Sequence, residues 1–194
     1  MTMRSWCFAF LCVCAASFVI AGCGSGASVV DHADGGGDGG LQASVCPGPG
    51  CTVSSPGILT CAVGFACSIP SSGSQHVNCG ARSSCSGACG ASCDVDCSMG
   101  ATCTVTLGDS TSSSCDMAHC TVTTGASASY HCLDSATCAL TLGASSSATC
   151  EGGSRCDFVC PGSCGLECRD TSTCTVRCAS DTTARSFTGS TTCS

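Results

Sequence analysis

Apolar and polar residues alternate in short runs along most of the chain. Residues 103–107 place cysteine, valine and leucine at every second position, with threonines between them. Such alternation predicts a β-strand with one buried face. Similar runs over 120–123, 138–142 and 174–177 predict further strands. One position of each run is large and apolar in six of seven cases and predicts an inner row: Ile69, Gly87, Val105, Val122, Leu140, Phe158 and Val176.

These runs recur with a period of 18 residues, broken by one interval of 17. A short fixed period predicts a solenoid, because each unit buries its inner face only against its neighbours. We therefore predict an all-β fold, a disulfide-ribbed β-solenoid of about seven 18-residue coils. An irregular disulfide-rich fold, whose periodicity only reflects gene duplication, is the alternative. Eighteen residues equal three six-residue edges, which favours a triangular left-handed coil over a flattened right-handed one.

Two cysteines lie near the start of each unit, in the pattern C-x5-C-x11, with one residue fewer between Cys115 and Cys120. Pairing within each unit is the hypothesis that this spacing suggests, although sequence alone does not determine connectivity. The seven in-repeat pairs would join Cys61 to Cys67, Cys79 to Cys85, Cys97 to Cys103, Cys115 to Cys120, Cys132 to Cys138, Cys150 to Cys156 and Cys168 to Cys174. The remaining cysteines could pair as Cys46–Cys51, Cys89–Cys93, Cys160–Cys164 and Cys178–Cys193.

Glycines and threonines complete the repeat. Gly108, Gly125 and Gly143 each lie five residues after the second cysteine and predict the tight corner at which a strand turns. Threonines alternate with the buried positions and should face outward. Thr102-Cys103-Thr104 and Thr173-Cys174-Thr175 resemble the Thr-Cys-Thr repeats of the disulfide-rich insect antifreeze solenoids. That resemblance implies a flat outer face of threonine ranks, including Thr104, Thr106, Thr121 and Thr123.

The N-terminal segment, residues 1–22, has the pattern of a signal peptide: Arg4 precedes an apolar run from Trp6 to Ala21. This run is shorter than the ~20 residues of a membrane-spanning helix. It ends in Ile20-Ala21-Gly22-Cys23, which resembles the lipobox of bacterial lipoprotein precursors. The resemblance implies cleavage before Cys23 and attachment of lipid to this residue. It also implies a protein anchored by lipid to a membrane of the bacterial cell envelope; Gly24 favours the outer membrane or cell surface.

The sequence predicts two segments after the signal peptide. Residues 23–45 are rich in glycine and aspartate and form a lipidated, flexible tether. Residues 46–194 form the cysteine-rich repeat domain. Only 19 of its 149 residues are Val, Ile, Leu or Phe, so disulfides must supply much of its stability. We expect the oxidised chain to fold and the reduced chain to remain unfolded.

Composition narrows the class of function. The full chain has 26 cysteines in 194 residues, which is typical of disulfide-rich proteins in oxidising compartments. Its net charge of −7 and lack of lysine disfavour nucleic acid as a partner. After Cys23 no two cysteines lie closer than four residues apart, so the C-x2-C spacing of zinc sites is missing. We expect no resident metal and no other cofactor.

We also expect no catalytic residues. No G-x-S-x-G motif occurs, and neither Glu151 nor Glu167 has an evident partner. Asp94 and Asp96 lie on one strand face and either bind a cation or form a solvated edge. The sequence therefore predicts a non-catalytic, membrane-anchored surface lipoprotein with a structural, adhesive or recognition role, whose partner is an extracellular protein or glycan. A metal-sequestering protein, an extracellular enzyme inhibitor and an ice-binding-like solenoid remain alternatives.

Overall fold

The computed structural model describes residues 49–55, 57–71 and 74–194, which lie within one compact unit, Gly40–Ser194. The predicted signal peptide, Cys23, the predicted tether and Cys46 lie outside the described residues. The described chain forms 17 β-strands. They are β1 Cys51–Ser55, β2 Ile58–Cys61, β3 Ala66–Ile69, β4 His76–Cys79, β5 Ser84–Cys89, β6 Asp94–Cys97, β7 Thr102–Leu107, β8 Ser112–Asp116, β9 His119–Thr124, β10 Ser129–Leu133, β11 Thr137–Thr141, β12 Ser146–Cys150, β13 Arg155–Cys160, β14 Cys164–Cys168, β15 Thr173–Cys178, β16 Arg185–Phe187 and β17 Gly189–Cys193.

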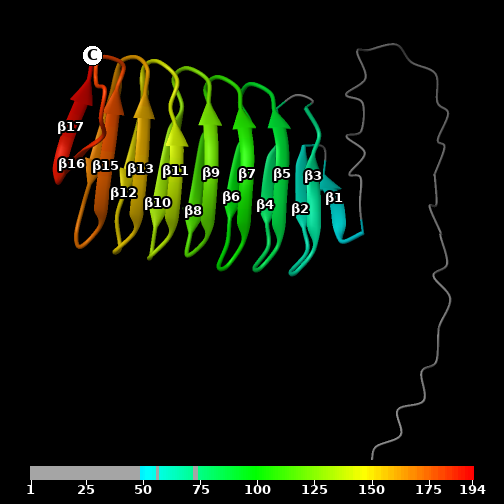
Figure 1. Cartoon of the computed structure of the whole chain (residues 1–194). Helices are drawn as coiled ribbons and strands as arrows, with labels where there is room; N and C mark the ends of the chain where they lie inside the picture. Colours follow the sequence, from blue (N-terminus) through cyan, green and yellow to red (C-terminus); the bar gives the residue numbers. More distant parts are fainter. Residues whose placement is uncertain (1–48, 56, 72–73) are drawn as a thin grey trace, which may run out of the picture. The chain divides into compact units, whose positions relative to one another are not determined.

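The strands alternate between two sheets, so the chain is a β-solenoid (Figure 1). From β2 to β15, each even-numbered strand and the odd-numbered strand after it form one coil, which gives seven coils. Sheet A has the order β1-β2-β4-β6-β8-β10-β12-β14-β17, and sheet B the order β16-β15-β13-β11-β9-β7-β5-β3. The predicted solenoid is thus confirmed. The prediction of a triangular cross-section was wrong, because each coil has two strands rather than three.

Coil stacking keeps equivalent residues in register. Within sheet A the first cysteine of each unit lies opposite the first cysteine of the next unit on the neighbouring strand, from Cys61 to Cys168. Within sheet B the second cysteines of successive units lie opposite each other in the same way, from Cys67 to Cys174. The missing residue between Cys115 and Cys120 shortens only the turn from β8 to β9, so both columns continue through the shorter coil.

The core lies between the sheets and consists of cysteines and small or medium apolar side chains. Along β7 the pattern is strict: Cys103, Val105 and Leu107 are buried, and the threonines between them are exposed. The predicted inner row is buried at six of its seven positions. Gly87 is the exception and is exposed. A larger residue does not fit there, because its Cβ would lie 3.0 Å from the amide nitrogen of Ile69 on the neighbouring strand and still closer to the Ile69 carbonyl oxygen.

The glycines after the odd strands are needed for close stacking rather than for a left-handed turn. A Cβ on Gly108 would lie 2.6 Å from both the amide nitrogen of Ala91 and the carbonyl carbon of Gly90. The left-handed conformation at this edge is instead adopted by serines, whose φ angles lie between 56° and 59°. Their amides donate to carbonyl oxygens of the next coil at 2.6–2.9 Å, and the residues are Ser92, Ser110, Ser127 and Ser145.

Antiparallel strands cover three of the four sheet ends. β1 pairs with β2 at the start of sheet A, and β17 pairs with β14 at its other end. β16 pairs with β15 at the corresponding end of sheet B. Phe187 in β16 packs against Phe158 with ring centroids 6.0 Å apart, so β16 also covers the end of the core.

Candidate functional site

Disulfides connect the two sheets inside every coil. Each of the seven in-repeat pairs suggested by the spacing is joined in the structure: Cys61–Cys67, Cys79–Cys85, Cys97–Cys103, Cys115–Cys120, Cys132–Cys138, Cys150–Cys156 and Cys168–Cys174. Cys89–Cys93 and Cys160–Cys164 lie at the opposite edge, at the turns from coil 2 to coil 3 and from coil 6 to coil 7. Cys51 is also disulfide-bonded, and Cys46, its partner in the sequence hypothesis, lies outside the described residues.

Ten disulfides join pairs of described cysteines and indicate an extracellular or otherwise oxidising environment. Within this part of the chain, no helix has the length and apolar character needed to span a membrane.

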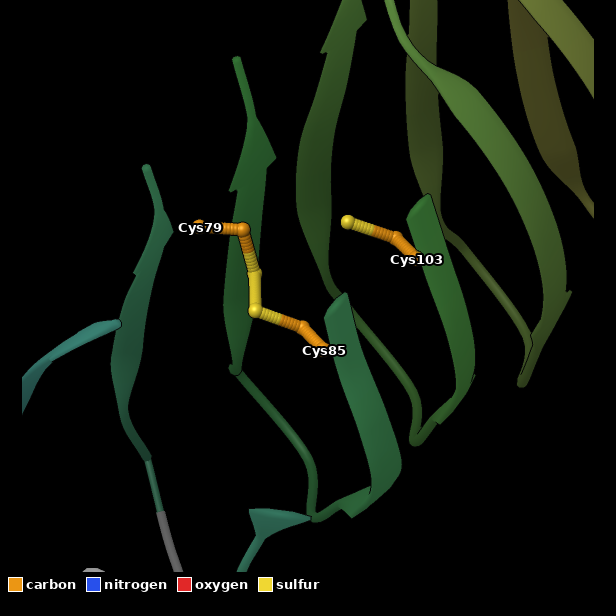
Figure 2. Close-up of side chains that lie close together, drawn as sticks. All are labelled: Cys79, Cys85 and Cys103. Carbon is orange, nitrogen blue, oxygen red and sulfur yellow. A yellow bond between two sulfur atoms is a disulfide. The ribbon is translucent and has the colours of Figure 1, made fainter. Parts of the chain in front are cut away.

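Disulfides of neighbouring coils come close to each other in three places. Figure 2 shows one of them, where the sulfur of Cys103 faces the Cys79–Cys85 disulfide. Three sulfur atoms in each group lie within 4.8 Å of one another. Each group contains the disulfide of one coil and the sheet B cysteine of the next coil, and its cysteines are buried: Cys79, Cys85 and Cys103; Cys97, Cys103 and Cys120; Cys132, Cys138 and Cys156. We call these the sulfur triads.

The outer surface of sheet B is rich in hydroxyl groups. Its strands β7, β9 and β11 direct seven threonines outward, together with His119 and Ala139. Parallel pairing aligns them across the strands: Thr104 with Thr121, and Thr106 with Thr123. Adjacent strands lie about 4.8 Å apart, and alternate residues along a strand about 6.6 Å apart. We call this set the hydroxyl face: Thr102, Thr104, Thr106, His119, Thr121, Thr123, Thr137, Ala139 and Thr141.

The outer surface of sheet A differs, because it carries acids and histidines. Asp94 and Asp96 lie side by side on β6, and each ties its coil to the next. Oδ1 of Asp94 accepts a hydrogen bond from the Ser112 amide at 2.7 Å, and Oδ1 of Asp96 accepts one from the Ser114 hydroxyl at 2.6 Å. Nε2 of His76 lies 3.5 Å from Oδ2 of Asp96. These carboxylates therefore take part in contacts between coils.

Burial raises the pKa of Tyr130, on β10, far above its ordinary value, and the negative charge of Asp96 raises it further. The hydroxyl of Tyr130 thus stays protonated in the folded protein at any physiological pH. Sequence reasoning did not identify this residue, although it lies two positions before Cys132 on the same face of β10, which was a signal of burial.

Glu151 and Glu167, for which the sequence showed no partner, share one in the structure. Arg169 places Nη1 3.6 Å from Oε2 of Glu151 and Nη2 2.7 Å from Oε2 of Glu167. Glu151 precedes Arg169 by one repeat of 18 residues, so the stacking of coils brings these charges together. The expectation that the two glutamates are unpaired was therefore wrong.

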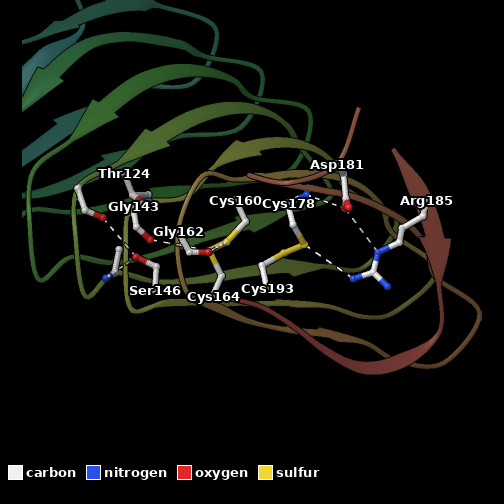
Figure 3. Close-up of a disulfide and its surroundings, with 12 residues drawn as sticks. Thr124, Gly143, Ser146, Cys160, Gly162, Cys164, Cys178, Asp181, Arg185 and Cys193 are labelled. Atoms are coloured by element: carbon white, nitrogen blue, oxygen red, sulfur yellow. Dashed lines mark hydrogen bonds and ion pairs between the residues drawn. A yellow bond between two sulfur atoms is a disulfide. The ribbon is translucent and has the colours of Figure 1, made fainter. Parts of the chain in front are cut away.

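A disulfide and an ion pair stabilise the C-terminal end of the solenoid. The disulfide Cys178–Cys193 ties β15 to β17 (Figure 3). Oδ2 of Asp181 accepts a hydrogen bond from the Cys178 amide at 3.1 Å and lies 3.7 Å from Nε of Arg185. Beside β16 a shallow hollow of about 350 Å³ opens, lined by Arg155, Asp157, Ser172, Thr173, Cys174, Thr175, Ser186, Phe187 and Thr188.

Comparisons with protein-family models, curated proteins and solved structures gave no match to this chain.

Proposed function

We propose that this protein is a lipid-anchored module of the bacterial cell surface that recognises a neutral glycan through the hydroxyl face. The observation that carries this proposal is the contrast between the two outer surfaces. The hydroxyl face holds seven threonines in register, while the acids Asp94 and Asp96 lie on sheet A. A rigid array of uncharged hydroxyls suits a partner that offers many neutral hydrogen-bonding groups.

Rigidity supports this role. Each strand of the hydroxyl face belongs to a coil that is closed by a disulfide, namely Cys97–Cys103, Cys115–Cys120 or Cys132–Cys138. Side chains fixed on such a framework lose little conformational freedom when a ligand binds, which favours binding by many weak contacts. A lipid on Cys23 and the tether over 23–45 would hold this framework at the membrane surface and leave the face accessible.

Binding to insoluble neutral polysaccharides tests the recognition role. The purified protein is mixed with cellulose, chitin or cross-linked dextran, and the bound fraction is measured after centrifugation. The double variant Thr104→Arg/Thr121→Arg places two long cations on the hydroxyl face and should abolish binding. The control Ser112→Arg/Ser147→Arg makes the same change at exposed positions of sheet A and should bind like the wild type. Equal binding by both variants, or no binding by the wild type, contradicts the proposal.

Mass spectrometry tests the anchor separately. The mature protein should begin at Cys23 and carry the added mass of a diacylglyceryl group. The variant Cys23→Ala should keep the signal peptide and lack this mass. A mature chain that begins elsewhere, or an unmodified Cys23, contradicts lipid anchoring but leaves the polysaccharide test intact.

Ice binding is a second candidate because two threonine pairs, Thr104 with Thr106 and Thr121 with Thr123, lie on adjacent strands in register. The regular array is small, because Ala139 and then Asp157 interrupt the same column. Thermal hysteresis measured with the wild type and with Thr104→Arg/Thr121→Arg distinguishes the candidates. Hysteresis that disappears in the variant favours ice as the ligand, whereas polysaccharide binding without hysteresis favours the glycan.

A further inference from the structure

The sulfur triads place a potential nucleophile beside a disulfide of the preceding coil. The three sulfurs of Cys79, Cys85 and Cys103 lie within 4.8 Å of one another, and their residues are at most 1% exposed. In the intact protein Cys103 is bonded to Cys97. If that bond were opened, the Cys103 sulfur would become a thiolate already positioned next to a second disulfide, where close approach greatly increases the effective concentration of the reactants.

We propose that the sulfur triads form tracks for intramolecular disulfide exchange between neighbouring coils: coils 2 and 3, coils 3 and 4, and coils 5 and 6. Cys103 belongs both to the triad with Cys79 and Cys85 and to the triad with Cys97 and Cys120, so these two triads share an atom and connect three coils. The third triad connects Cys156 to the Cys132–Cys138 disulfide. Among the described cysteines, no triad joins coil 4 to coil 5.

The exchange step is balanced without any net oxidation. A small-molecule thiolate first attacks Cys97 of the Cys97–Cys103 disulfide, forms a mixed disulfide with Cys97 and releases Cys103 as a thiolate. The Cys103 thiolate then attacks the sulfur of Cys85. A Cys85–Cys103 bond forms, the Cys79–Cys85 bond breaks, and the electron pair leaves on the sulfur of Cys79, which takes up a proton. The free thiol has then moved from coil 3 to coil 2.

Backbone geometry favours Cys85 as the point of attack. Cys85 and Cys103 are direct partners in the parallel pairing of β5 with β7. Neighbouring strands lie about 4.8 Å apart, which falls within the 4.4–6.8 Å range of Cα separations that disulfides span. The new bond therefore links adjacent coils without a large movement of either strand.

Single substitutions that free one cysteine test the tracks. In Cys97→Ser the freed residue is Cys103, which belongs to a triad. In the matched control Cys168→Ser the freed residue is Cys174, which takes the same place relative to the Cys150–Cys156 disulfide but belongs to no triad among the described residues. Each protein is kept oxidised at mildly alkaline pH, quenched in acid, denatured and alkylated with a maleimide. Peptide mass spectrometry then locates the label.

In Cys97→Ser we expect between about a tenth and a half of the label on Cys79, because exchange between similar disulfides has an equilibrium constant near one. In Cys168→Ser the label should stay on Cys174. The rate at which label appears on Cys79 should rise with pH, because the thiolate is the attacking form. Label confined to Cys103 overturns the proposal, as does equal redistribution in the control.

Two further variants apply the same test if Cys97→Ser does not fold, as judged by circular dichroism. Cys115→Ser frees Cys120 and should transfer label to Cys97, and Cys150→Ser frees Cys156 and should transfer label to Cys132. Label that remains on the freed cysteine in both folded variants overturns the proposal.

Discussion

Replacing Gly108 with alanine should strongly destabilise the solenoid, although alanine differs from glycine by one methyl group. The new Cβ would lie 2.6 Å from the Ala91 amide nitrogen and 2.8 Å from the Gly90 carbonyl oxygen, both backbone atoms of the preceding coil. Ordinary contact begins at 3.4 Å. The strand end must therefore move by about 0.8 Å, and overpacking forces backbone shifts of this kind.

The size of the effect follows from what this movement disturbs. Overpacking costs about 1–3 kcal/mol. The shift also weakens the hydrogen bond from the Gly108 amide to the Cys89 carbonyl, 2.9 Å long, and such a bond contributes about 0.5–1.5 kcal/mol. We therefore expect Gly108→Ala to lower the free energy of unfolding by about 2–4 kcal/mol.

Gly165 supplies the matched control. It lies on the exposed surface of β14, and a Cβ there would meet no atom within 4 Å. Gly165→Ala should be neutral or stabilise the protein by up to about 1 kcal/mol, because alanine restricts the unfolded chain.

Guanidinium unfolding of the oxidised proteins, followed by far-UV circular dichroism, measures both effects. Gly108→Ala should lower the midpoint by about 0.5–1 M, given the usual slopes for small domains. A midpoint for Gly108→Ala within error of that for Gly165→Ala would refute the reasoning that close coil stacking requires glycine at this position.

Three further outcomes are expected. Leu140 lies in the inner row and is 1% exposed. Leu140→Ala should lower the free energy of unfolding in guanidinium by about 2–5 kcal/mol, whereas Leu140→Met should lower it by less than about 1.5 kcal/mol. Similar losses of stability in the two variants would contradict a tightly packed row. Replacing Cys178 and Cys193 with serines removes a disulfide of sequence separation 15 and should lower the free energy of unfolding by about 3 kcal/mol. Hydrogen exchange should then increase in β17 before it increases in β9, and a uniform increase would disprove this expectation. Tyr130 is the only tyrosine of the chain, and its raised pKa means that stability is retained below the unfolded pKa of about 10 and falls as pH rises above it; absorbance at 295 nm should show tyrosinate near pH 11 in the denatured protein but not in the native one.

The repeat and its buried row could be predicted from the sequence, because both depend on spacing. Parallel strands of successive coils align residues that are one period apart, so Cys103 lies beside Cys120 and Val105 beside Val122. Alternation also determines which side chains face outward, as Thr104 and Thr106 do.

The shape of the coil could not be predicted in this way. Eighteen residues are compatible with three short edges or with two strands and two corners, and the corners decide between them. One corner depends on serines such as Ser110 and Ser127 in a left-handed conformation. A serine in a sequence does not indicate this conformation, unlike a glycine. Their cost is offset by the regular hydrogen bonds that their amides donate to the next coil.

Contacts between side chains of neighbouring coils also could not be predicted from the sequence. The bridge from Arg169 to two glutamates and the sulfur triads depend on distances across the stack. Spacing identifies which residues are neighbours in a column, but the direction of each side chain determines whether their atoms meet.

The antiparallel strands at the ends of sheet A have an evolutionary consequence. A parallel coil continues readily onto another parallel coil, whereas β1 and β17 end the series with strands of opposite direction. Duplication of whole units between these ends would lengthen the molecule by about 4.8 Å per coil without altering either terminus. The protein can therefore change its reach by copying internal units, while the strands at the two ends of sheet A stay the same.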